Sequence, residues 1–353
     1  MRISEALLSS FQSARHLKEA GARVNAIDFH AKADVLVSSA DDETIRAYDT
    51  NSGQFVTQVP CKKYGCTQVK TTHHHASILH ASSRPSPDAN DPLGAHAIRY
   101  LSLHDNKYIS YFAGHSAAVN SLDMSPTSDQ FLTAAKDNTV RLWDLRQSGR
   151  PLNSQVNNCD LPDPVAAFDR QGLIFAVSGT TGETKLFDVR NYQSGAFQTI
   201  PPPTDVLRSV NALPTYGGAQ APAACSSIRF SLDGKNILLS FDGAWVNLDS
   251  YSGEVKSCAS TRGENDDAIA GSTRTEASFS PDGAYIVAGC ADHAIRVWTS
   301  TKDQNSLRAR EVARWKEGVG HAGVPRCVKW APRRMLVASA CQAVVLWLPL
   351  QKV

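Results

Sequence analysis

The segment LTAAKDNTVRLWD, residues 132–144, decides the fold because close copies of it recur along the chain. VSSADDETIRAYD (37–49) and VAGCADHAIRVWT (287–299) align with it without gaps. Each copy runs from an apolar strand through small residues to an aspartate, then to an Ile or Val followed by an arginine, and then to an aromatic residue. The aligned residues are Asp42, Asp137 and Asp292, then Arg46, Arg141 and Arg296, then Tyr48, Trp143 and Trp298. Such self-similarity indicates a repeat architecture.

Four weaker copies, at residues 96–105, 179–190, 238–250 and 337–349, fill the gaps between the strong ones. The seven copies are about 40 to 60 residues apart, the range expected of propeller blades. An upstream strand precedes each copy, and several of these strands end in tight-turn residues, as in EASFSPDG (276–283). We therefore predict an all-β fold over residues 1–353, a single seven-bladed WD-repeat β-propeller.

The two ends of the chain are expected to close the ring together. The seventh copy ends near Leu350, which leaves no room for a fourth strand, and the first inner strand begins only near Val24. The unassigned segment Ala14–Lys18 is therefore predicted to supply the outer strand of blade 7. Closure of this kind removes exposed sheet edges.

The third copy carries the full set of polar residues that is typical of WD repeats. By resemblance to that family, His115, Thr133, Asp137 and Trp143 are expected to form a buried hydrogen-bonded chain. Each of these groups would be left with an unsatisfied donor or acceptor if it were buried alone, at about 1–3 kcal/mol per group. Partial sets are expected at Asp42 and Tyr48, at Asp292 and Trp298, and at His321, Ser339 and Trp347. The last set lacks the aspartate, so that chain should be incomplete.

These polar residues superficially resemble a hydrolase triad, but a structural role is the better interpretation. A catalytic site occurs once, whereas these residues recur from blade to blade, and the chain has no G-x-S-x-G motif. We therefore predict no catalytic residues, no enzymatic activity and no cofactor.

Composition narrows the other function classes. The net charge of +2 does not favour bulk binding to nucleic acid or membranes, and we expect neither sequence-specific nucleic-acid binding nor a membrane association. The N-terminus lacks the pattern of a signal peptide. The eight cysteines are scattered, so we expect reduced thiols without disulfides or zinc. The run His73–His75 lacks a carboxylate or Cys partner and is expected in an exposed turn, so no metal site is predicted.

Three stretches lengthen the repeat spacing: Ser83–His96, Pro201–Pro222 and Ser257–Thr273. In a propeller the turn between the second and third strands opens on the same face as the connection to the next blade. All three insertions are thus expected on one face, where loops on a rigid scaffold commonly bind partners. A tolerated, non-functional insertion is an equally good interpretation of the Pro-rich first stretch.

A basic stretch runs through the last two blades. It contains Arg308, Arg310, Arg314, Lys316, Arg326, Lys329, Arg333 and Arg334. A phosphopeptide or nucleic-acid contact is one interpretation. A solvated surface divided between both rims is favoured, because these positions alternate among strands and loops.

Several strings resemble one family more specifically than a generic WD repeat does. They are KKYG (62–65), IRYLSLHDNKYISYFAGHS (98–116), GLIFAV (172–177), EASFSPDG (276–283) and ASACQAVVLWLP (338–349). They are similar to the WD-repeat subunit of COMPASS-type histone H3 lysine-4 methyltransferase complexes. The resemblance runs from about Leu7 to Pro349, whereas the stretch at 83–96 departs from the shorter, acidic turn of that family.

The resemblance implies a nuclear, non-catalytic scaffold that recruits a SET-domain methyltransferase to transcribed chromatin. It also implies a link to the phosphorylated C-terminal tail of RNA polymerase II, and membership as a monomer in a hetero-complex. Lys62, Lys63 and Tyr64 belong to a matched string on the expected binding face and are the candidate partner-binding residues. Alternatives are a scaffold in an mRNA 3′-end processing or nuclear phosphatase complex, and a substrate receptor of a cullin-type ubiquitin ligase.

Overall fold

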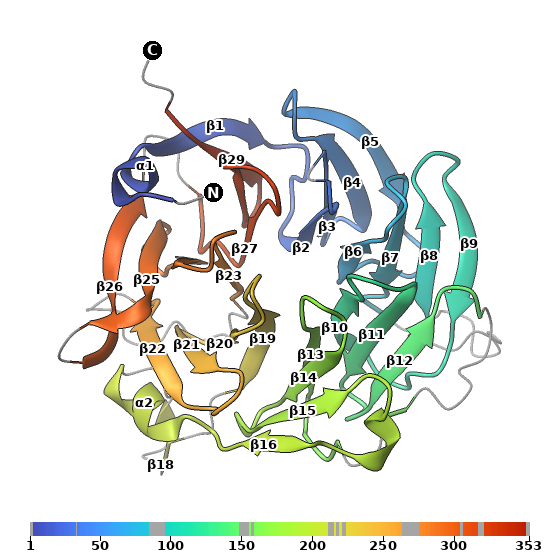
Figure 1. Cartoon of the computed structure of the whole chain (residues 1–353). Helices are drawn as coiled ribbons and strands as arrows, with labels where there is room; N and C mark the ends of the chain where they lie inside the picture. The colour runs from blue at the N-terminus through green and yellow to red at the C-terminus, as the bar shows by residue number, and fades with distance from the viewer. Residues whose placement is uncertain are drawn as a thin grey trace.

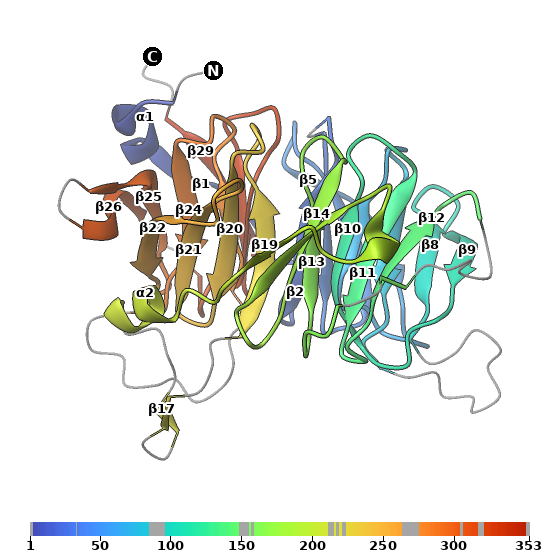
Figure 2. The same ribbon diagram turned by 60° about the horizontal axis from the view of Figure 1, so that its bottom comes forward.

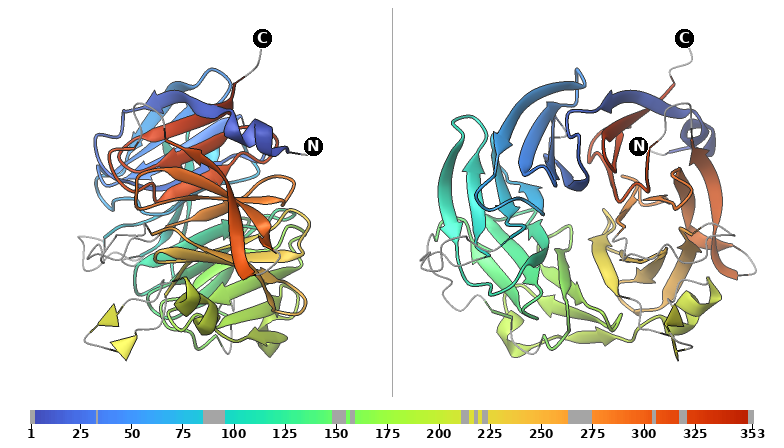
Figure 3. Two further views of the ribbon diagram at one scale, coloured as in Figure 1. Left: turned by 90° about the vertical axis from the view of Figure 1, so that its left-hand side faces the viewer. Right: turned by 180° about the vertical axis from the view of Figure 1, so that it is seen from behind.

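The computed structural model describes residues 3–32, 34–84, 96–147, 155–156, 159–210, 215–216, 219–220, 224–262, 275–303, 306–316 and 321–350. Seven blades of antiparallel strands stand around a central axis (Figure 1). A view from behind shows the same closed ring, and an edge-on view shows a disc (Figure 3). The predicted all-β fold with seven propeller blades is confirmed.

Each blade begins with a strand at the axis and proceeds outward. Blade 1 contains β2 (Val24–Phe29), β3 (Val35–Ala40), β4 (Thr44–Asp49) and β5 (Gln54–Pro60). Blade 2 contains β6 (Val69–Thr71), β7 (Ser77–Ala81), β8 (Ile98–Ser102) and β9 (Lys107–Phe112). Blade 3 contains β10 (Val119–Met124), β11 (Gln130–Ala135) and β12 (Val140–Asp144). Blade 4 contains β13 (Val165–Phe168), β14 (Ile174–Ser178), β15 (Thr184–Asp188) and β16 (Gln198–Ile200).

The remaining blades follow the same order. Blade 5 contains β19 (Cys225–Phe230), β20 (Asn236–Phe241), β21 (Ala244–Asp249) and β22 (Val255–Ser260). Blade 6 contains β23 (Ala277–Phe279), β24 (Tyr285–Gly289), β25 (Ile295–Asp303) and β26 (Ser306–Trp315). Blade 7 contains β27 (Cys327–Trp330), β28 (Val337–Ala340), β29 (Val344–Pro349) and β1 (Phe11–Leu17). Outside the blades lie α1 (Glu5–Ser9), η1 (Tyr192–Ser194), α2 (Thr204–Ser209) and the hairpin of β17 (Thr215–Tyr216) and β18 (Ala219–Gln220).

The N-terminal strand closes the ring, in the role predicted for residues 14–18. β1 begins earlier than predicted and pairs antiparallel with β29, from Phe11 opposite Pro349 to Leu17 opposite Val344. The Phe11 ring stacks on Trp315 with ring centroids 4.7 Å apart, so β1 also contacts blade 6. Trp315 in turn donates its indole N–H to the Leu8 carbonyl oxygen at 2.8 Å. The N-terminal segment is thus packed into the fold from α1 onward.

The alternation of strands gives the disc two distinct faces. The connection face carries the turns between second and third strands, such as Asp42–Glu43, and the links between blades, such as residues 61–65. The hairpin face carries the turns between first and second and between third and fourth strands, such as residues 231–235 and 250–254. α2 lies on the connection face and α1 on the hairpin face, and Figure 2 shows the two helices at opposite sides of the disc.

The inner strands bring one equivalent position from every blade to the central channel. These positions are Asp28, Lys70, Asp123, Ala167, Arg229, Ser278 and Lys329. Lys70 Nζ lies 3.2 Å from Asp28 and 2.9 Å from Asp123, and Lys329 Nζ lies 3.0 Å from Asp28. Arg229 lies 3.9 Å from Asp123 and 3.5 Å from Glu276. This chain of ion pairs joins blades 7, 1, 2, 3, 5 and 6 around the axis.

Asp28 shows how the channel satisfies its buried charges. Burial opposes ionisation of this carboxyl, but Lys70, Lys329 and hydrogen bonds from Thr71 hold its pKa well below the usual range. The Thr71 N–H donates to Asp28 Oδ2 at 2.9 Å across the boundary between blades 1 and 2. Asp123 accepts the Phe168 N–H at 2.9 Å in the same way between blades 3 and 4. Buried ion pairs of this kind add little net stability, but removal of one partner would leave a buried charge unpaired.

The insertions differ from their predicted bounds. Ser257–Ser260 belong to the outer strand of blade 5, so the predicted start of the third insertion at Ser257 was wrong, and residues 263–273 lie outside the described part of the chain. The second insertion contains α2 and the β17–β18 hairpin, while its residues 211–214, 217–218 and 221–222 are outside the description. Residues 85–95, within the first insertion at 83–96, also lie outside the described part of the chain. No helix in the described residues is long and apolar enough to cross a membrane.

We predict that Phe11→Ala strongly destabilises the propeller. Phe11 is buried against Trp315 and Trp330, so the truncation leaves a cavity at the seam that closes the ring. The free energy of unfolding, measured by guanidinium denaturation, should fall by about 3–5 kcal/mol. Ala14→Ser, on the exposed face of the same strand, should change it by about 0.5 kcal/mol or less. Equal stability of both variants would mean that β1 does not hold the ring closed.

Candidate partner-binding site and the polar chains that support it

The structure brings the four polar residues of blade 3 together. Thr133 Oγ1 accepts a hydrogen bond from Trp143 Nε1 at 2.8 Å and lies 2.7 Å from His115 Nε2. The other imidazole nitrogen, Nδ1, lies 3.0 Å from Asp137 Oδ2. Asp137 also accepts the N–H groups of Ser116 at 2.9 Å and Thr139 at 3.0 Å. A single chain of contacts therefore ties the link before blade 3 to β11, the Asp turn and β12.

The arrangement is suited to holding strands in register rather than to chemistry. Both nitrogens of His115 are engaged, and the imidazole side chain is almost fully buried at 1% exposure. Burial opposes ionisation of Asp137, but its contacts with His115, Thr139 and Ser116 hold its pKa far below the usual range. A carboxylate with its oxygens occupied in this way has no spare capacity to act on a substrate.

Blade 7 keeps the chain but replaces its acidic member. Ser339 Oγ lies 2.6 Å from His321 Nε2 and accepts the Trp347 indole N–H at 2.7 Å. The aspartate is missing, as the sequence indicates, but the series of polar contacts continues beyond the His321 imidazole. Cys341 takes the vacant position, and its Sγ lies 3.2 Å from His321 Nδ1. Burial, followed by nearby His16 and His293, lowers the pKa of His321 to about 4.

Blades 1 and 6 satisfy the aspartate with an arginine instead of a histidine. Asp42 accepts the Thr44 hydroxyl at 2.6 Å and pairs with Arg46 at 2.5 Å. Asp292 pairs with Arg296 at 2.8 Å and also contacts Arg314.

The aromatic residues of these two blades are buried among apolar rings. Tyr48 meets Phe55 edge-on with centroids 6.1 Å apart. Trp298 meets Trp245 edge-on at 5.7 Å. The partial sets of these two blades therefore consist of a separate ion pair and a packed ring.

The candidate partner-binding residues form a tight turn on the connection face, between β5 and β6. Lys62 and Lys63 are exposed and Tyr64 is partly exposed. The Cys61 carbonyl oxygen accepts the N–H groups of Tyr64 at 3.2 Å and Gly65 at 2.7 Å. Gly65 has φ 67°, and a Cβ there would lie 1.7 Å from Ser83 Oγ, so the turn requires glycine.

A buried arginine supports this turn from below. The Arg99 guanidinium stacks on the Tyr64 ring, 3.6 Å from its centroid, and the side chain is fully buried. Its Nη1 donates to the Ala97 carbonyl oxygen at 3.0 Å and to Ser82. Its Nε and Nη2 find no acceptor among the residues that the structure describes. Arg99 aligns with Arg46 and Arg296, whose carboxylate partner is replaced in this blade by Ala95, so the Tyr64 ring supplies a cation–π contact instead.

Two further contacts hold the turn in place. The Tyr64 carbonyl oxygen accepts the N–H groups of Ser83 at 3.1 Å and Arg84 at 3.3 Å. Arg84 pairs with Glu43 at 2.8 Å, which links the turn to the Asp turn of blade 1. Lys62 and Lys63 are therefore presented on a fixed backbone.

Other residues singled out by the sequence lie apart from this site. His73–His75 lie in the turn between β6 and β7 on the hairpin face, and their side chains are exposed. No group of three His, Cys, Asp or Glu side chains within the described ranges is arranged to hold a metal ion. All eight cysteines are buried free thiols.

The basic stretch is dispersed. Arg308 and Arg310 lie on the outer strand of blade 6, Lys329 lines the channel, and Arg333 is at its hairpin-face mouth. Arg310 pairs with Glu5 of α1, and Arg308 donates to the Ser209 carbonyl oxygen at 2.6 Å. These residues do not form one patch.

Sequence reasoning missed two features that matter for the site. The stacking of Arg99 on Tyr64 joins a residue of β8 to a residue of the turn between β5 and β6, and no local pattern signals it. The ring of channel charges uses one position per inner strand, so an alignment of those seven strands would have displayed it.

Comparisons with known proteins agree with the observed repeats. A family model described as "WD domain, G-beta repeat" matches residues 11–49, 106–144 and 252–299. The chain is 33% identical to WD repeat-containing protein 82 of Drosophila melanogaster over 99% of this chain and 98% of the relative. It is 33% identical to the Set1 complex component swd2 of Schizosaccharomyces pombe, over 79% and 72%. It is 28% identical to the COMPASS component SWD2 of Saccharomyces cerevisiae, over 91% and 89%.

We predict that Thr133→Val weakens blade 3 well beyond the loss of one small polar group. The valine keeps the shape but leaves the Trp143 indole N–H without its acceptor and removes the contact of His115. Each buried unsatisfied group costs about 1–3 kcal/mol, so unfolding should require about 2–4 kcal/mol less free energy. Thr127→Val, at an exposed turn position, should leave the unfolding midpoint unchanged. A neutral result at Thr133 would show that the chain of contacts is not stabilising.

We also predict that acid destabilises the fold through His321. Its folded pKa of about 4 lies below the unfolded value of 6.5, so its contribution to stability is present above pH 6.5 and is lost as the pH falls toward 4. Between pH 7.5 and pH 5 the loss from this residue should be about 2 kcal/mol. His80, whose pKa burial lowers to about 3, adds a loss of the same sign. The measurement is urea denaturation at both pH values, in wild type and in His321→Gln, whose pH-dependent loss should be smaller by that amount. An equal loss in both would contradict the assignment.

Proposed function

The chain belongs to the WD-repeat family that includes WD repeat-containing protein 82 and the Set1 complex component swd2, and from this premise we propose that it is a non-catalytic scaffold subunit of a COMPASS-type histone H3 lysine-4 methyltransferase complex. The observation that carries the proposal is similarity, over 79% and 91% of this chain, to two relatives whose names place them in the Set1 and COMPASS complexes. The site of action would accordingly be chromatin in the nucleus.

The geometry supports a scaffold rather than an enzyme. The residues that most resemble catalytic groups, His115 and Asp137, are fully engaged in a structural chain. The same arrangement recurs in blade 7 with a thiol in place of the carboxylate, which would change any acid–base chemistry but preserves the strand contacts. A rigid closed disc with fixed surface turns can instead hold several proteins at once.

The turn of Lys62, Lys63 and Tyr64 is the proposed contact with a partner. Lys62 and Lys63 are exposed. The Lys63 ammonium lies 5.0 Å from the centroid of the Tyr64 ring, on which Arg99 stacks at 3.6 Å. Such a fixed turn loses little conformational entropy on binding. Its charge suits an acidic partner segment, and the phosphorylated C-terminal tail of RNA polymerase II is the proposed one. In this role the chain would link a SET-domain methyltransferase to transcribed chromatin.

We predict that affinity purification of the intact chain from nuclei recovers a SET-domain methyltransferase together with other COMPASS-type subunits. The double variant Lys62→Glu with Lys63→Glu should reduce recovery of the partner that contacts the turn by about tenfold, because charge reversal opposes an acidic segment. The readout is quantitative mass spectrometry of the purified complexes. Lys302→Glu, at an exposed lysine near the end of β25, is the matched control and should leave recovery unchanged.

The other outcomes each identify a different role. Recovery of only 3′-end processing or phosphatase subunits would replace the methyltransferase assignment, and recovery of a cullin adaptor would make the chain a substrate receptor. Methyl transfer by the purified chain alone would overturn the scaffold role.

A further inference from the structure

The hairpin face of blades 4 and 5 presents an unusual group of exposed apolar side chains. Among the described residues, ten large apolar side chains are exposed, and four of them lie in turns of this one region. They are Leu173 at 48% exposure, Phe197 at 58%, Leu232 at 46% and Tyr251 at 88%. Exposed apolar residues that gather on one surface mark interaction sites, whereas scattered ones need no explanation.

Contacts within blade 5 and across its boundary with blade 4 join the turns that bear Phe197, Tyr251 and Leu232. Gln198, next to Phe197, donates its side-chain amide to the Tyr251 carbonyl oxygen at 3.0 Å. A Cβ on Gly253 would lie 3.1 Å from Ile200 of β16, so the turn of blade 5 packs directly on the outer strand of blade 4. The Ser250 hydroxyl donates to the Gly234 carbonyl oxygen at 2.8 Å, which joins this turn to the one that bears Leu232.

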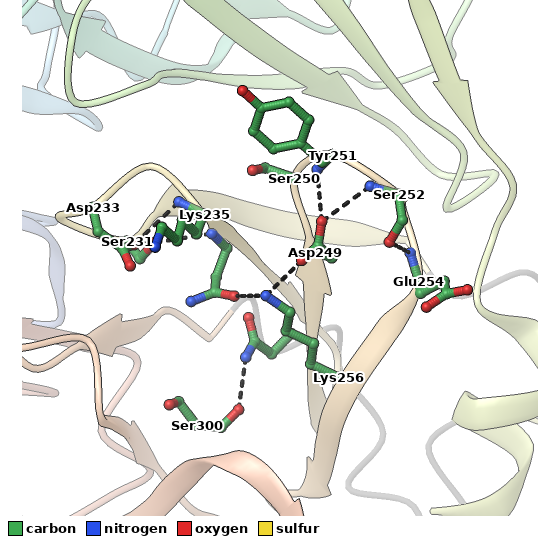
Figure 4. A network of polar contacts seen from close by, with 12 residues as sticks. Ser231, Asp233, Lys235, Asp249, Ser250, Tyr251, Ser252, Glu254, Lys256 and Ser300 are labelled. Atoms are coloured by element: carbon green, nitrogen blue, oxygen red, sulfur yellow. Dashed lines mark hydrogen bonds and ion pairs between the residues drawn. The ribbon is translucent and has the colours of Figure 1, made fainter.

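Tyr251 is exposed on a rigid turn. Asp249 Oδ1 accepts the N–H groups of Tyr251 at 2.8 Å and Ser252 at 3.0 Å, while its Oδ2 pairs with Lys256 at 2.6 Å. Lys256 also donates to Asn236 at 2.7 Å. Figure 4 shows the phenol ring directed away from this network. The hydrogen bond from Lys256 and those of the turn lower the pKa of Asp249 to about 2, so the network persists throughout the neutral range.

The same face opens on the central channel. A cavity of about 480 Å³ begins at the ends of the inner strands, and both Leu232 and Arg170 line it, so the apolar group and the cavity are continuous. The charges inside the channel neutralise one another, because the three cations Lys70, Arg229 and Lys329 are paired with the three carboxylates Asp28, Asp123 and Glu276. A charged ligand would therefore find its partners among the side chains at the cavity mouth, not among those inside the channel.

Two arginines at the cavity mouth have no ion-pair partner in the described part of the chain. They are Arg170 and Arg333, and both are exposed. The neighbouring carboxylates cap turns instead. Asp169 accepts the N–H groups of Gln171, Leu173 and Ile174, and Asp233 accepts that of Lys235. Glu254 is an exposed carboxylate in the Tyr251 turn.

We propose that this surface, formed by Leu173, Phe197, Leu232 and Tyr251 with Arg170 and Arg333, binds an acidic protein segment that carries an aromatic or leucine anchor. The anchor packs against Tyr251 and its apolar neighbours, while acidic residues reach the two arginines at the cavity mouth. Aromatic residues on fixed turns are typical centres of binding energy. The surface lies opposite the Lys62 turn, so the disc would hold two partners on its two faces, and the inference does not depend on the identity of the complex.

The test selects random 12-residue peptides displayed on phage against the full chain, and measures the enriched peptides by fluorescence polarisation. We expect enrichment of Asp and Glu next to Phe, Tyr or Leu. Tyr251→Ala and Arg170→Glu should each weaken binding about tenfold. Replacing one acidic peptide residue with arginine should restore binding to Arg170→Glu, because the contact is direct. Phe55→Ala, an exposed aromatic on the outer strand of blade 1, and Lys62→Glu are matched controls that should bind as wild type does.

Several results would overturn the proposal. They are basic enriched sequences, acidic peptides whose affinity is insensitive to Tyr251→Ala and Arg170→Glu, loss of binding in Lys62→Glu, or no enrichment at all. Sedimentation of the chain alone provides an independent check. Self-association abolished by Tyr251→Ala would assign the surface to a second copy of this chain and would likewise contradict an acidic partner segment.

Discussion

The antiparallel pairing of β1 with β29 is the constraint on which the rest of the structure depends. It makes the last blade from both ends of the chain, so every blade has a neighbouring blade on each side. Without β1, the edge of β29 and the apolar rings that Phe11 covers, including Trp315 and Trp330, would be exposed. Closure also fixes the distances between the inner strands, and only at those distances can single side chains such as Lys70 bridge carboxylates from two other blades.

The blades differ in the residues that satisfy the buried polar groups near the Asp turn. The polar groups near the Asp turn are buried, so each requires a partner. Blade 3 uses His115 with Asp137, blade 7 uses His321 with Cys341, and blades 1 and 6 pair the aspartate with an arginine. Blade 2 retains the arginine but not the aspartate, and Arg99 stacks on Tyr64 instead. Blade 2 lacks the aspartate that usually pairs with this arginine, and the Tyr64 ring, next to Lys62 and Lys63 in sequence, takes its place. The candidate site therefore lies where blade 2 departs from the repeat.

The sequence predicted the features that recur from blade to blade, but not the contacts that occur only once. The strand-turn-strand pattern occurs seven times, so the weak copies could be recognised by comparison with the strong ones. The seven copies predicted the number of blades, and the residues left over predicted the role of the N-terminal strand. The bounds of that strand were wrong by a few residues because Phe11 begins directly after α1, which has only five residues and too little periodicity to be recognised. Ser257–Ser260 were assigned to an insertion because their small polar residues do not resemble a strand, although they pair with β21. The contacts of Tyr64 with Arg99 and of Lys70 with Asp123 depend on distances between blades, and no local pattern carries that information.

The surface charge of the disc follows from how its turns are built. Tight turns require acceptors for their N–H groups, and this chain supplies aspartates for that purpose at Asp49, Asp169, Asp188, Asp233 and Asp249. A carboxylate that accepts two or three backbone hydrogen bonds is held close to its own turn, and Asp249 alone of these five also forms an ion pair among the described residues, with Lys256. The arginines and lysines of the same turns are then left facing solvent, even though the chain as a whole is nearly neutral at +2. A hairpin face with exposed cations is therefore a consequence of capping chemistry. The addition of exposed aromatic and leucine side chains at blades 4 and 5 distinguishes that sector, because nothing in turn formation requires them.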